Sequence, residues 1–260
     1  MNDTPSGGFA DDAPTSAFSC FTLEPFPEVR PGDDLAAAIA AVLKAGESAL
    51  RDGDIVVAVS KVVSIAEGRY VDLGTVSPGP RALELAGQTG KPAPLVQLIL
   101  NESTSHRLAT ERGPIIAWHR LGYELTSAGI DRVGDRGAWL LPEDPDRSAR
   151  ALRDALAAAT GARVAVLVVD SDGRPDRLGA TVIAIGAAGI RPLRVTGNIE
   201  PGGRVKRQEE TLADLLAGAA GVLVGQRGRG APVAVLRGVR YAADDSGIAS
   251  ILYRRPEPGV

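Results

Sequence analysis

Residues 162–173 read ARVAVLVVDSDG, and this stretch decides the fold. Its first part is almost wholly apolar and rich in β-branched valine, a pattern typical of a strand covered on both faces. Asp170 ends the apolar run, and Ser171, Asp172 and Gly173 follow it. Oxygen ligands at the exit of a buried strand suit Mg²⁺ or Mn²⁺. The same residues are also common in a solvated turn, so this segment alone leaves both interpretations open.

Outward from this strand, the hydrophobic pattern predicts a mixture of helices and strands. Apolar runs predict strands at residues 55–59, 114–118 and 231–239, with a further apolar segment at residues 181–190. Helices are predicted within residues 31–50, 78–90, 137–161 and 209–225, and one more begins near Pro92. We therefore expect an α+β fold with a mixed sheet, although the pattern does not tell parallel from antiparallel pairing.

Composition narrows the class of protein. The chain has 260 residues, a net charge of -3 and only 4% aromatic residues, which argues against nucleic acid or an anionic membrane surface as a partner. The single cysteine, Cys20, excludes an intramolecular disulfide and a thiolate metal cage. Because no apolar run reaches the length of a membrane span and no secretory signal is evident, we expect a cytoplasmic protein.

The beginning of the chain differs in composition from the remainder. Residues 1–22 are rich in Gly, Pro, Ser, Asp and Thr, and we expect them to form a disordered tail. Order is expected to begin near Phe26, within one domain that spans residues 23–260.

Two further segments contain candidate functional residues. Asp131 follows Ser127-Ala128-Gly129, small residues that allow a close backbone approach. Ser60 and Lys61 follow the strand predicted at residues 55–59, where a lysine would meet a phosphate as a point charge. Taken alone, Asp131 is equally well explained as an acidic residue in a turn, and Lys61 as a surface lysine. Asp131 and Asp170 would suit one divalent cation if the fold brought them together.

A glycine-rich segment between the helix at residues 209–225 and the last predicted strand is the remaining candidate. Three glycines with arginines between them expose backbone N–H groups that suit phosphates. The segment lacks the Gly-Lys-Ser/Thr ending of a Walker loop, and a plain flexible connection explains it equally well. Its residues are Val224, Gly225, Gln226, Arg227, Gly228, Arg229, Gly230 and Ala231.

The order of several motifs resembles the coenzyme F420-0:L-glutamate ligase family. The motifs are LEPFPEVRPGDDL (23–35), DGDIVVAVSKVVSIAEGR (52–69), SPGPRALELA (77–86), SAGID (127–131), LLPEDPDRSARALR (140–153), DSDGRP (170–175) and AIGAAGIRPL (184–193). The resemblance covers about residues 24–240, and LPEDPD and AIGxAGI are its most distinctive parts. It implies a ligase-like fold in two lobes and a homodimer.

The resemblance also implies a reaction. Members of the family join L-glutamate to a small-molecule carboxylate, the lactyl group of F420-0, through an amide bond and with GTP. A carboxylate is a poor acyl donor, so phosphorylation would first convert it into an acyl phosphate, which the amine then attacks. Mg²⁺ or Mn²⁺ would neutralise the charge that develops on the phosphate oxygens.

Residue by residue, the resemblance assigns a metal and catalytic role to Asp131 and Asp170. Ser171 stands at the position of a threonine ligand, and Gln226 at a position where some members have a metal-binding glutamate. The nucleotide is expected along Phe26, Pro27, Glu28 and Val29, along Ser60, Lys61 and Gly134, and along the glycine-rich segment from Val224 to Ala231.

Several positions depart from the family pattern. Ile65 replaces a second lysine that meets the nucleotide, Gly134 replaces an asparagine directed toward it, and residues 195–207 differ from the usual stretch. These departures keep two alternatives open. One is a diverged ligase that acts on another carboxylate in a biosynthetic pathway, and the other is a binding protein that no longer turns over a nucleotide.

Overall fold

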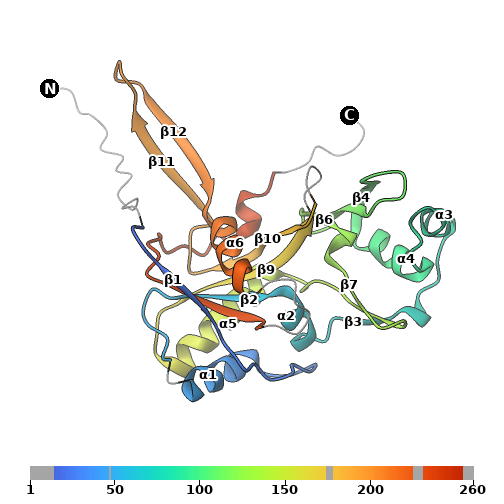
Figure 1. The fold of residues 1–260 in the computed structure, drawn as a ribbon, viewed down its shortest axis with the longest axis horizontal. Helices are drawn as coiled ribbons and strands as arrows, with labels where there is room; N and C mark the ends of the chain where they lie inside the picture. The colour runs from blue at the N-terminus through green and yellow to red at the C-terminus, as the bar shows by residue number, and fades with distance from the viewer. Residues whose placement is uncertain (1–14, 47, 174–177, 225–230, 254–260) are drawn as a thin grey trace.

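The computed structural model describes residues 15–46, 48–173, 178–224 and 231–253. These residues form helices and mixed sheets, which confirms the α+β prediction. A large lobe and a small lobe lie side by side (Figure 1), and each has its own cluster of buried hydrophobic side chains. None of the described helices is long and apolar enough to cross a membrane.

A five-stranded sheet forms the centre of the large lobe. Its strands, in spatial order, are β1 (Ser19–Thr22), β13 (Val233–Arg237), β2 (Ile55–Val59), β9 (Ala165–Gly173) and β10 (Ala180–Ala188). The pairs are antiparallel except β2 with β9, which run parallel. Parallel neighbours require a crossover connection. Here the crossover contains the whole small lobe as well as two helices of the large lobe.

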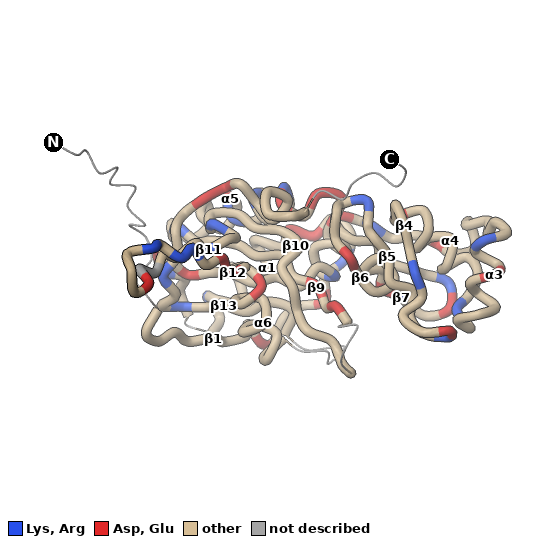
Figure 2. Tube along the Cα trace, turned by 90° about the horizontal axis from the view of Figure 1, so that it is seen from above, with Lys and Arg blue, Asp and Glu red and all other residues tan. Residues whose placement is uncertain are grey.

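Helices cover both faces of this sheet. The helices of the large lobe are α1 (Leu35–Ala45), α2 (Ser60–Ala66), α5 (Pro145–Thr160) and α6 (Leu212–Val224). α1 packs on α5, and α5 and α6 lie on opposite sides of the sheet (Figure 2). Asp34 and Asp144 cap α1 and α5, because their carboxylates accept the N–H groups of Ala37 and Arg147. The helices predicted in these regions are confirmed.

The small lobe contains two helices and two three-stranded sheets. The helices are α3 (Pro80–Thr89) and α4 (Ala93–Asn101), and the short 3-10 turns are η1 (Leu73–Thr75) and η2 (Ser127–Gly129). One sheet has the order β4 (Ser103–Leu108), β5 (Ile115–His119) and β6 (Glu124–Thr126). The other has the order β3 (Tyr70–Asp72), β8 (Gly137–Trp139) and β7 (Asp131–Val133).

The two most distinctive motifs of the sequence pack on each other. The buried carboxylate of Asp146, in LPEDPD, accepts the N–H of Ala187 in β10 at 2.8 Å. It also accepts the N–H groups of Ile248 and Ala249 at 2.8 and 3.0 Å, at the start of the 3-10 turn η3 (Ile248–Ile251). A Cβ at Gly186 would lie 2.3 Å from the carbonyl oxygen of Pro145. Both motifs therefore hold the fold together.

A two-stranded ribbon projects from the large lobe (Figure 1). It consists of β11 (Leu193–Ile199) and β12 (Val205–Thr211). We predicted a helix from residue 209, but β12 continues to Thr211 and α6 begins at Leu212. The strand continues because Glu210 lies opposite Arg194 in β11 and accepts its guanidinium N–H at 2.9 Å.

The structure also corrects the predicted start of the ordered chain. Ser19–Thr22 pairs with β13 at the edge of the sheet, so the tail predicted for residues 1–22 was wrong at these four positions. Cys20 and Phe21 are partly buried against the main core, and the Arg237 guanidinium lies 5.4 Å from the Phe21 ring centroid. Residues 1–14 lie outside the described part of the chain.

Candidate active site

The parallel pair β2 and β9 ends with two polar side chains in contact. Val59 pairs with Val169 at the end of β2, so Ser60 and Asp170 follow at the same edge of the sheet. The buried Ser60 hydroxyl donates a hydrogen bond to Asp170 Oδ1 at 2.8 Å. Ligands commonly bind at the carboxyl ends of parallel strands. The residues predicted at both strand exits are therefore brought together.

Asp131 reaches this edge from the small lobe through an unusual backbone turn. Ser127, Ala128 and Gly129 have φ values of 54°, 55° and 65°. Left-handed conformations of residues other than glycine store on the order of 1–3 kcal/mol each and often occur at functional sites. A Cβ at Gly129 would lie 2.9 Å from the Leu141 side chain, so this position requires glycine. The small residues permit the close approach that the sequence predicted.

Lys61 connects the two lobes electrostatically. Its Nζ lies 3.8 Å from Asp131 Oδ2, and both side chains are about half exposed. Such a solvated pair contributes little to stability, usually less than about 1 kcal/mol. The pair matters for the geometry of the site, because two consecutive residues at the start of α2 contact the two acids. Ser60 holds Asp170 in the large lobe, while Lys61 faces Asp131 in the small lobe.

Electrostatics around Asp170 favour a cation. Burial raises the pKa of this carboxyl to about 7, against the hydrogen bond from Ser60, which lowers it. The negative charges of Asp131 and Asp172 raise the pKa further, and the backbone N–H of Ser171 lowers it. A carboxyl whose pKa is raised by neighbouring negative charges is stabilised in its ionised form by a positive ion nearby. The location therefore suits a divalent cation.

The donor set fits a cation that arrives with phosphates. In the described ranges, no three His, Cys, Asp or Glu side chains form a group that would hold a metal. Mg²⁺ in nucleotide enzymes is usually bound by one or two carboxylates, while phosphates and water complete its octahedron. Asp131 and Asp170 match that pattern, whereas a resident structural metal would need more protein ligands.

Strand geometry separates Ser171 from its predicted partner. Successive side chains of a strand point to opposite faces, so the Ser171 hydroxyl and the Asp170 carboxylate diverge. Asp172 shares the face of Asp170, and its Oδ1 accepts the N–H of Thr126 at 3.3 Å. From the sequence, the segment containing Asp172 suited either oxygen ligands at a strand exit or a solvated turn, and no separate role was predicted for Asp172. Asp172 follows Asp170 by two residues, and in a strand that continues past Asp170 this spacing would have indicated that both side chains lie on one face.

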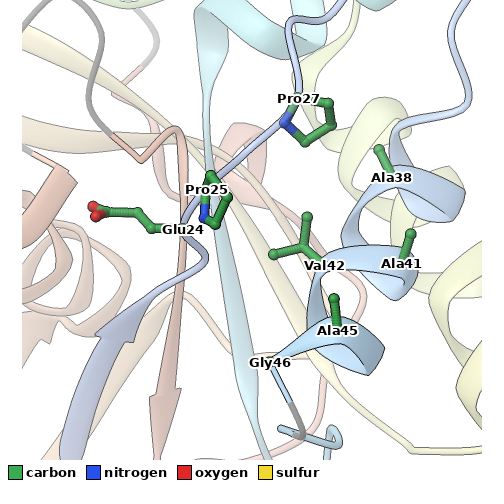
Figure 3. Close-up of a pocket in the computed structure, with 8 residues that line it drawn as sticks. All are labelled: Glu24, Pro25, Pro27, Ala38, Ala41, Val42, Ala45 and Gly46. Atoms are coloured by element: carbon green, nitrogen blue, oxygen red, sulfur yellow. The ribbon is translucent and has the colours of Figure 1, made fainter.

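The segment Phe26–Val29 has two sides. Phe26 and Val29 pack against the main core, while Pro27 and Glu28 are exposed. Pro27 lines a hollow of about 320 Å³, shown in Figure 3. The other lining residues are Glu24, Pro25, Ala38, Ala41, Val42, Ala45 and Gly46. This lining is apolar apart from Glu24, so the hollow offers no cation for a phosphate.

The remaining predicted residues are placed only in part. Gly134 is exposed in the turn after β7, and its φ of 57° suits glycine or asparagine. Val224 and Ala231 are buried at the two ends of the glycine-rich segment. Pro232, the next residue, accepts the N–H of Val59, so this end lies beside Ser60. The residues between, Gly225, Gln226, Arg227, Gly228, Arg229 and Gly230, lie outside the described residues.

Comparisons with known proteins agree with the motif order. The family model described as F420-0:Gamma-glutamyl ligase matches residues 25–238. The chain is 38% identical over 243 residues to the Coenzyme F420:L-glutamate ligase of Methanothermobacter thermautotrophicus, covering 91% of this chain and 96% of that protein. It is 41% identical over 228 residues to the protein of that name from Methanopyrus kandleri, covering 84% and 87%. The relative from Haloarcula marismortui is 35% identical over 250 residues, covering 92% and 94%.

Proposed function

The chain belongs to the F420-0:gamma-glutamyl ligase family, and we propose that it adds L-glutamate to coenzyme F420-0 through an amide bond. The names of the relatives support L-glutamate and coenzyme F420, and the family description supports F420-0. We further propose that GTP drives the reaction and that Mg²⁺ or Mn²⁺ assists it. The observation that carries this proposal is the convergence of Asp131, Asp170, Ser60 and Lys61 at the junction of the lobes.

In the proposed reaction, an oxygen of the F420-0 carboxylate attacks the γ-phosphorus of GTP. An acyl phosphate forms and GDP leaves. The glutamate amine then attacks the acyl carbon, phosphate leaves, and the amine loses a proton as the amide forms. The divalent cation, bound by Asp131 and Asp170, would neutralise charge on the phosphate oxygens. Ser60 would keep Asp170 oriented through both steps.

Lys61 supports nucleotide use despite the departure at Ile65. Residues four apart lie on the same face of a helix, so Lys61 and Ile65 occupy one face of α2. A lysine one turn earlier thus lies on the face where the family has its second lysine. Once a cation neutralises Asp131, the Lys61 ammonium would lose its carboxylate partner and turn toward a phosphate.

Phosphate release from GTP tests this proposal. Wild-type protein with Mg²⁺ should release phosphate only when both F420-0 and L-glutamate are present. Asp170→Asn should reduce turnover by at least about 100-fold, because a neutral amide holds the cation poorly. The matched control is Asp135→Asn, since the Asp135 side chain lies four residues from Asp131 and is 95% exposed. Full turnover by Asp170→Asn would refute the metal assignment.

The departures from the family pattern define the alternative outcomes. Ile65 and Gly134 keep open a ligase that acts on another carboxylate, and a screen of carboxylates and amines would reveal it. A thermal-shift measurement added to this screen would detect a binding protein that uses no nucleotide. In that case GTP with Mg²⁺ would leave the melting temperature unchanged.

We also propose that the chain acts as a homodimer. A lone two-stranded ribbon is only marginally stable in water, and the β11–β12 ribbon projects from the lobe (Figure 1). Directly after it, α6 leaves Leu215 and Val222 53% and 74% exposed at a spacing of seven residues, on one helical face. A second copy would cover this face and support the ribbon.

Light scattering tests the dimer. Wild-type protein should have twice the mass of the chain, and Leu215→Glu with Val222→Glu should produce monomers. Leu83→Glu on α3 is a matched control, because Leu83 is 56% exposed but lies in the small lobe. A monomeric wild type would contradict the dimer without affecting the ligase proposal.

A further inference from the structure

Two aromatic side chains lie in one row with Asp131. In the small sheet, Trp139 of β8 pairs directly with Asp131 of β7 on one side. On the other side Trp139 pairs directly with Tyr70 of β3. Directly paired residues of antiparallel strands point to the same face of a sheet. The Tyr70, Trp139 and Asp131 side chains therefore share one face.

That face looks toward the candidate active site. The residues that alternate with the row, Val71 and Ala138, pack into the core of the small lobe. Tyr70, Trp139 and Asp131 must consequently point away from that core. Asp131 meets Lys61 of α2, and β8 contacts the same helix. The row thus begins at the proposed metal site and extends away from it along the junction of the lobes.

The two rings are held in a defined arrangement. Their centroids are 5.2 Å apart and their planes meet at 66°, an edge-to-face contact. Tyr70 lies over the backbone of Gly137, because a Cβ at Gly137 would approach the Tyr70 ring atoms to 2.5 Å. Tyr70 is nevertheless 47% exposed, and Trp139 is only partly buried. Part of the aromatic surface of the pair is therefore accessible to a ligand.

We propose that Tyr70 and Trp139 form a stacking platform for the planar heteroaromatic ring of a ligand whose phosphate group lies at Asp131 and Asp170. This inference rests on the proposed function, which supplies two such ligands, the guanine nucleotide and the deazaflavin F420-0. Neighbouring strands are about 5 Å apart, so the platform lies about 5–10 Å from Asp131. This spacing suits a phosphate ester that carries its ring on a sugar or sugar-alcohol linker.

Tryptophan fluorescence distinguishes the two sources of the ring. The chain has two tryptophans, and Trp118→Phe leaves Trp139 as the sole reporter. GDP with Mg²⁺ and F420-0 are titrated separately, with correction for absorbance by each ligand. Quenching by GDP identifies the base as the stacked ring, whereas quenching by F420-0 identifies the deazaflavin. Quenching by neither ligand overturns the proposal.

Substitutions test whether the ring face contributes to binding. Trp139→Leu keeps an apolar side chain but removes the aromatic face. It should raise the dissociation constant of the stacked ligand about 5- to 100-fold. Trp139→Phe should restore most of that affinity. KM for the same ligand should rise with little change in kcat. Tripolyphosphate with Mg²⁺ is the control ligand, because it has phosphates but no ring.

Two outcomes would overturn the platform. One is wild-type affinity of Trp139→Leu for both ring ligands. The other is an equal loss of tripolyphosphate binding, which would mean that Trp139 merely positions Asp131. If Trp139→Leu does not fold, Tyr70→Leu and Tyr70→Phe are subject to the same criteria. A wild-type protein that binds ring ligands through Trp139 but forms no amide would instead refute the ligase and leave the platform standing.

Discussion

The replacement Asp146→Asn should destabilise the protein severely although it adds and removes almost no volume. The Asp146 carboxylate is 6% exposed and accepts three backbone N–H groups, two at Oδ1 and one at Oδ2. An asparagine offers one acceptor oxygen, and its NH₂ group would face one of these N–H groups. One hydrogen bond is then lost, and the other two lose the charge of their acceptor.

The magnitude follows from these contacts. A hydrogen bond to a charged group contributes about 1.5–3 kcal/mol, and a neutral one about 1 kcal/mol. The loss of one charged bond and the weakening of two others should lower the free energy of unfolding by about 2–5 kcal/mol. For a chain of this size, that change corresponds to a melting temperature lower by roughly 5–15 °C. Few single substitutions that conserve volume have an effect this large.

The assay is urea denaturation followed by circular dichroism, with Asp144→Asn as the matched control. Asp144 lies two residues earlier and caps α5 through the N–H of Arg147, a role that asparagine fills equally well. The control should stay within about 0.5 kcal/mol of wild type. Hydrogen exchange should also accelerate at Ile248 and Ala249 in Asp146→Asn. Equal stability of both variants would refute the reasoning that Asp146 locks LPEDPD to β10 and η3.

Three further predictions follow from the same structure. Ile65→Lys should tighten GTP binding about fivefold in calorimetry while Ile65→Gln does not, and no gain with lysine would mean that Lys61 already fills that role. Since burial raises the pKa of Asp170 to about 7, ionisation should cost the metal-free fold stability as pH rises from about 4 to 7. With a chelator present, the free energy of unfolding of Asp170→Asn should therefore be about 2–4 kcal/mol higher than that of wild type at pH 8, but equal to it at pH 4. The same difference at both pH values would contradict this prediction. Gly186→Ala should destabilise by more than about 2 kcal/mol, whereas Gly218→Ala in α6, which has free space, should stabilise by about 0.5–1 kcal/mol in thermal melts.

The large lobe was predictable from sequence because its elements carry strong patterns. β2 and the first five residues of β9 are unbroken apolar runs, and α1 and α5 have both a capping aspartate and an apolar stripe. The strands β3, β7 and β8 have three residues each, too few to display an alternation. α2 escaped prediction because it follows β2 directly and has no side-chain cap at its start.

The residues of the candidate site were predictable from the sequence, but the contacts between them were not. Asp131 and Asp170 were selected by motif order, and only the fold shows that Lys61 and Ser60 contact them. Ser171 and Asp172 could be told apart only once β9 was seen to continue as a strand to Gly173. Side-chain alternation then places Asp172 on the face of Asp170.

The topology explains why the site lies between the lobes. Because β2 and β9 are parallel, their carboxyl ends lie at one edge of the sheet, so Ser60, where the crossover begins, follows β2 beside Asp170 in β9. Asp131 lies within the crossover itself. One acid is therefore carried by each lobe, and a cation bound by both would bridge them. The Lys61 ammonium on α2 of the large lobe lies 3.8 Å from Asp131 Oδ2 of the small lobe. Cation binding should consequently couple to the relative position of the lobes, since neither Asp131 nor Asp170 can complete the site alone.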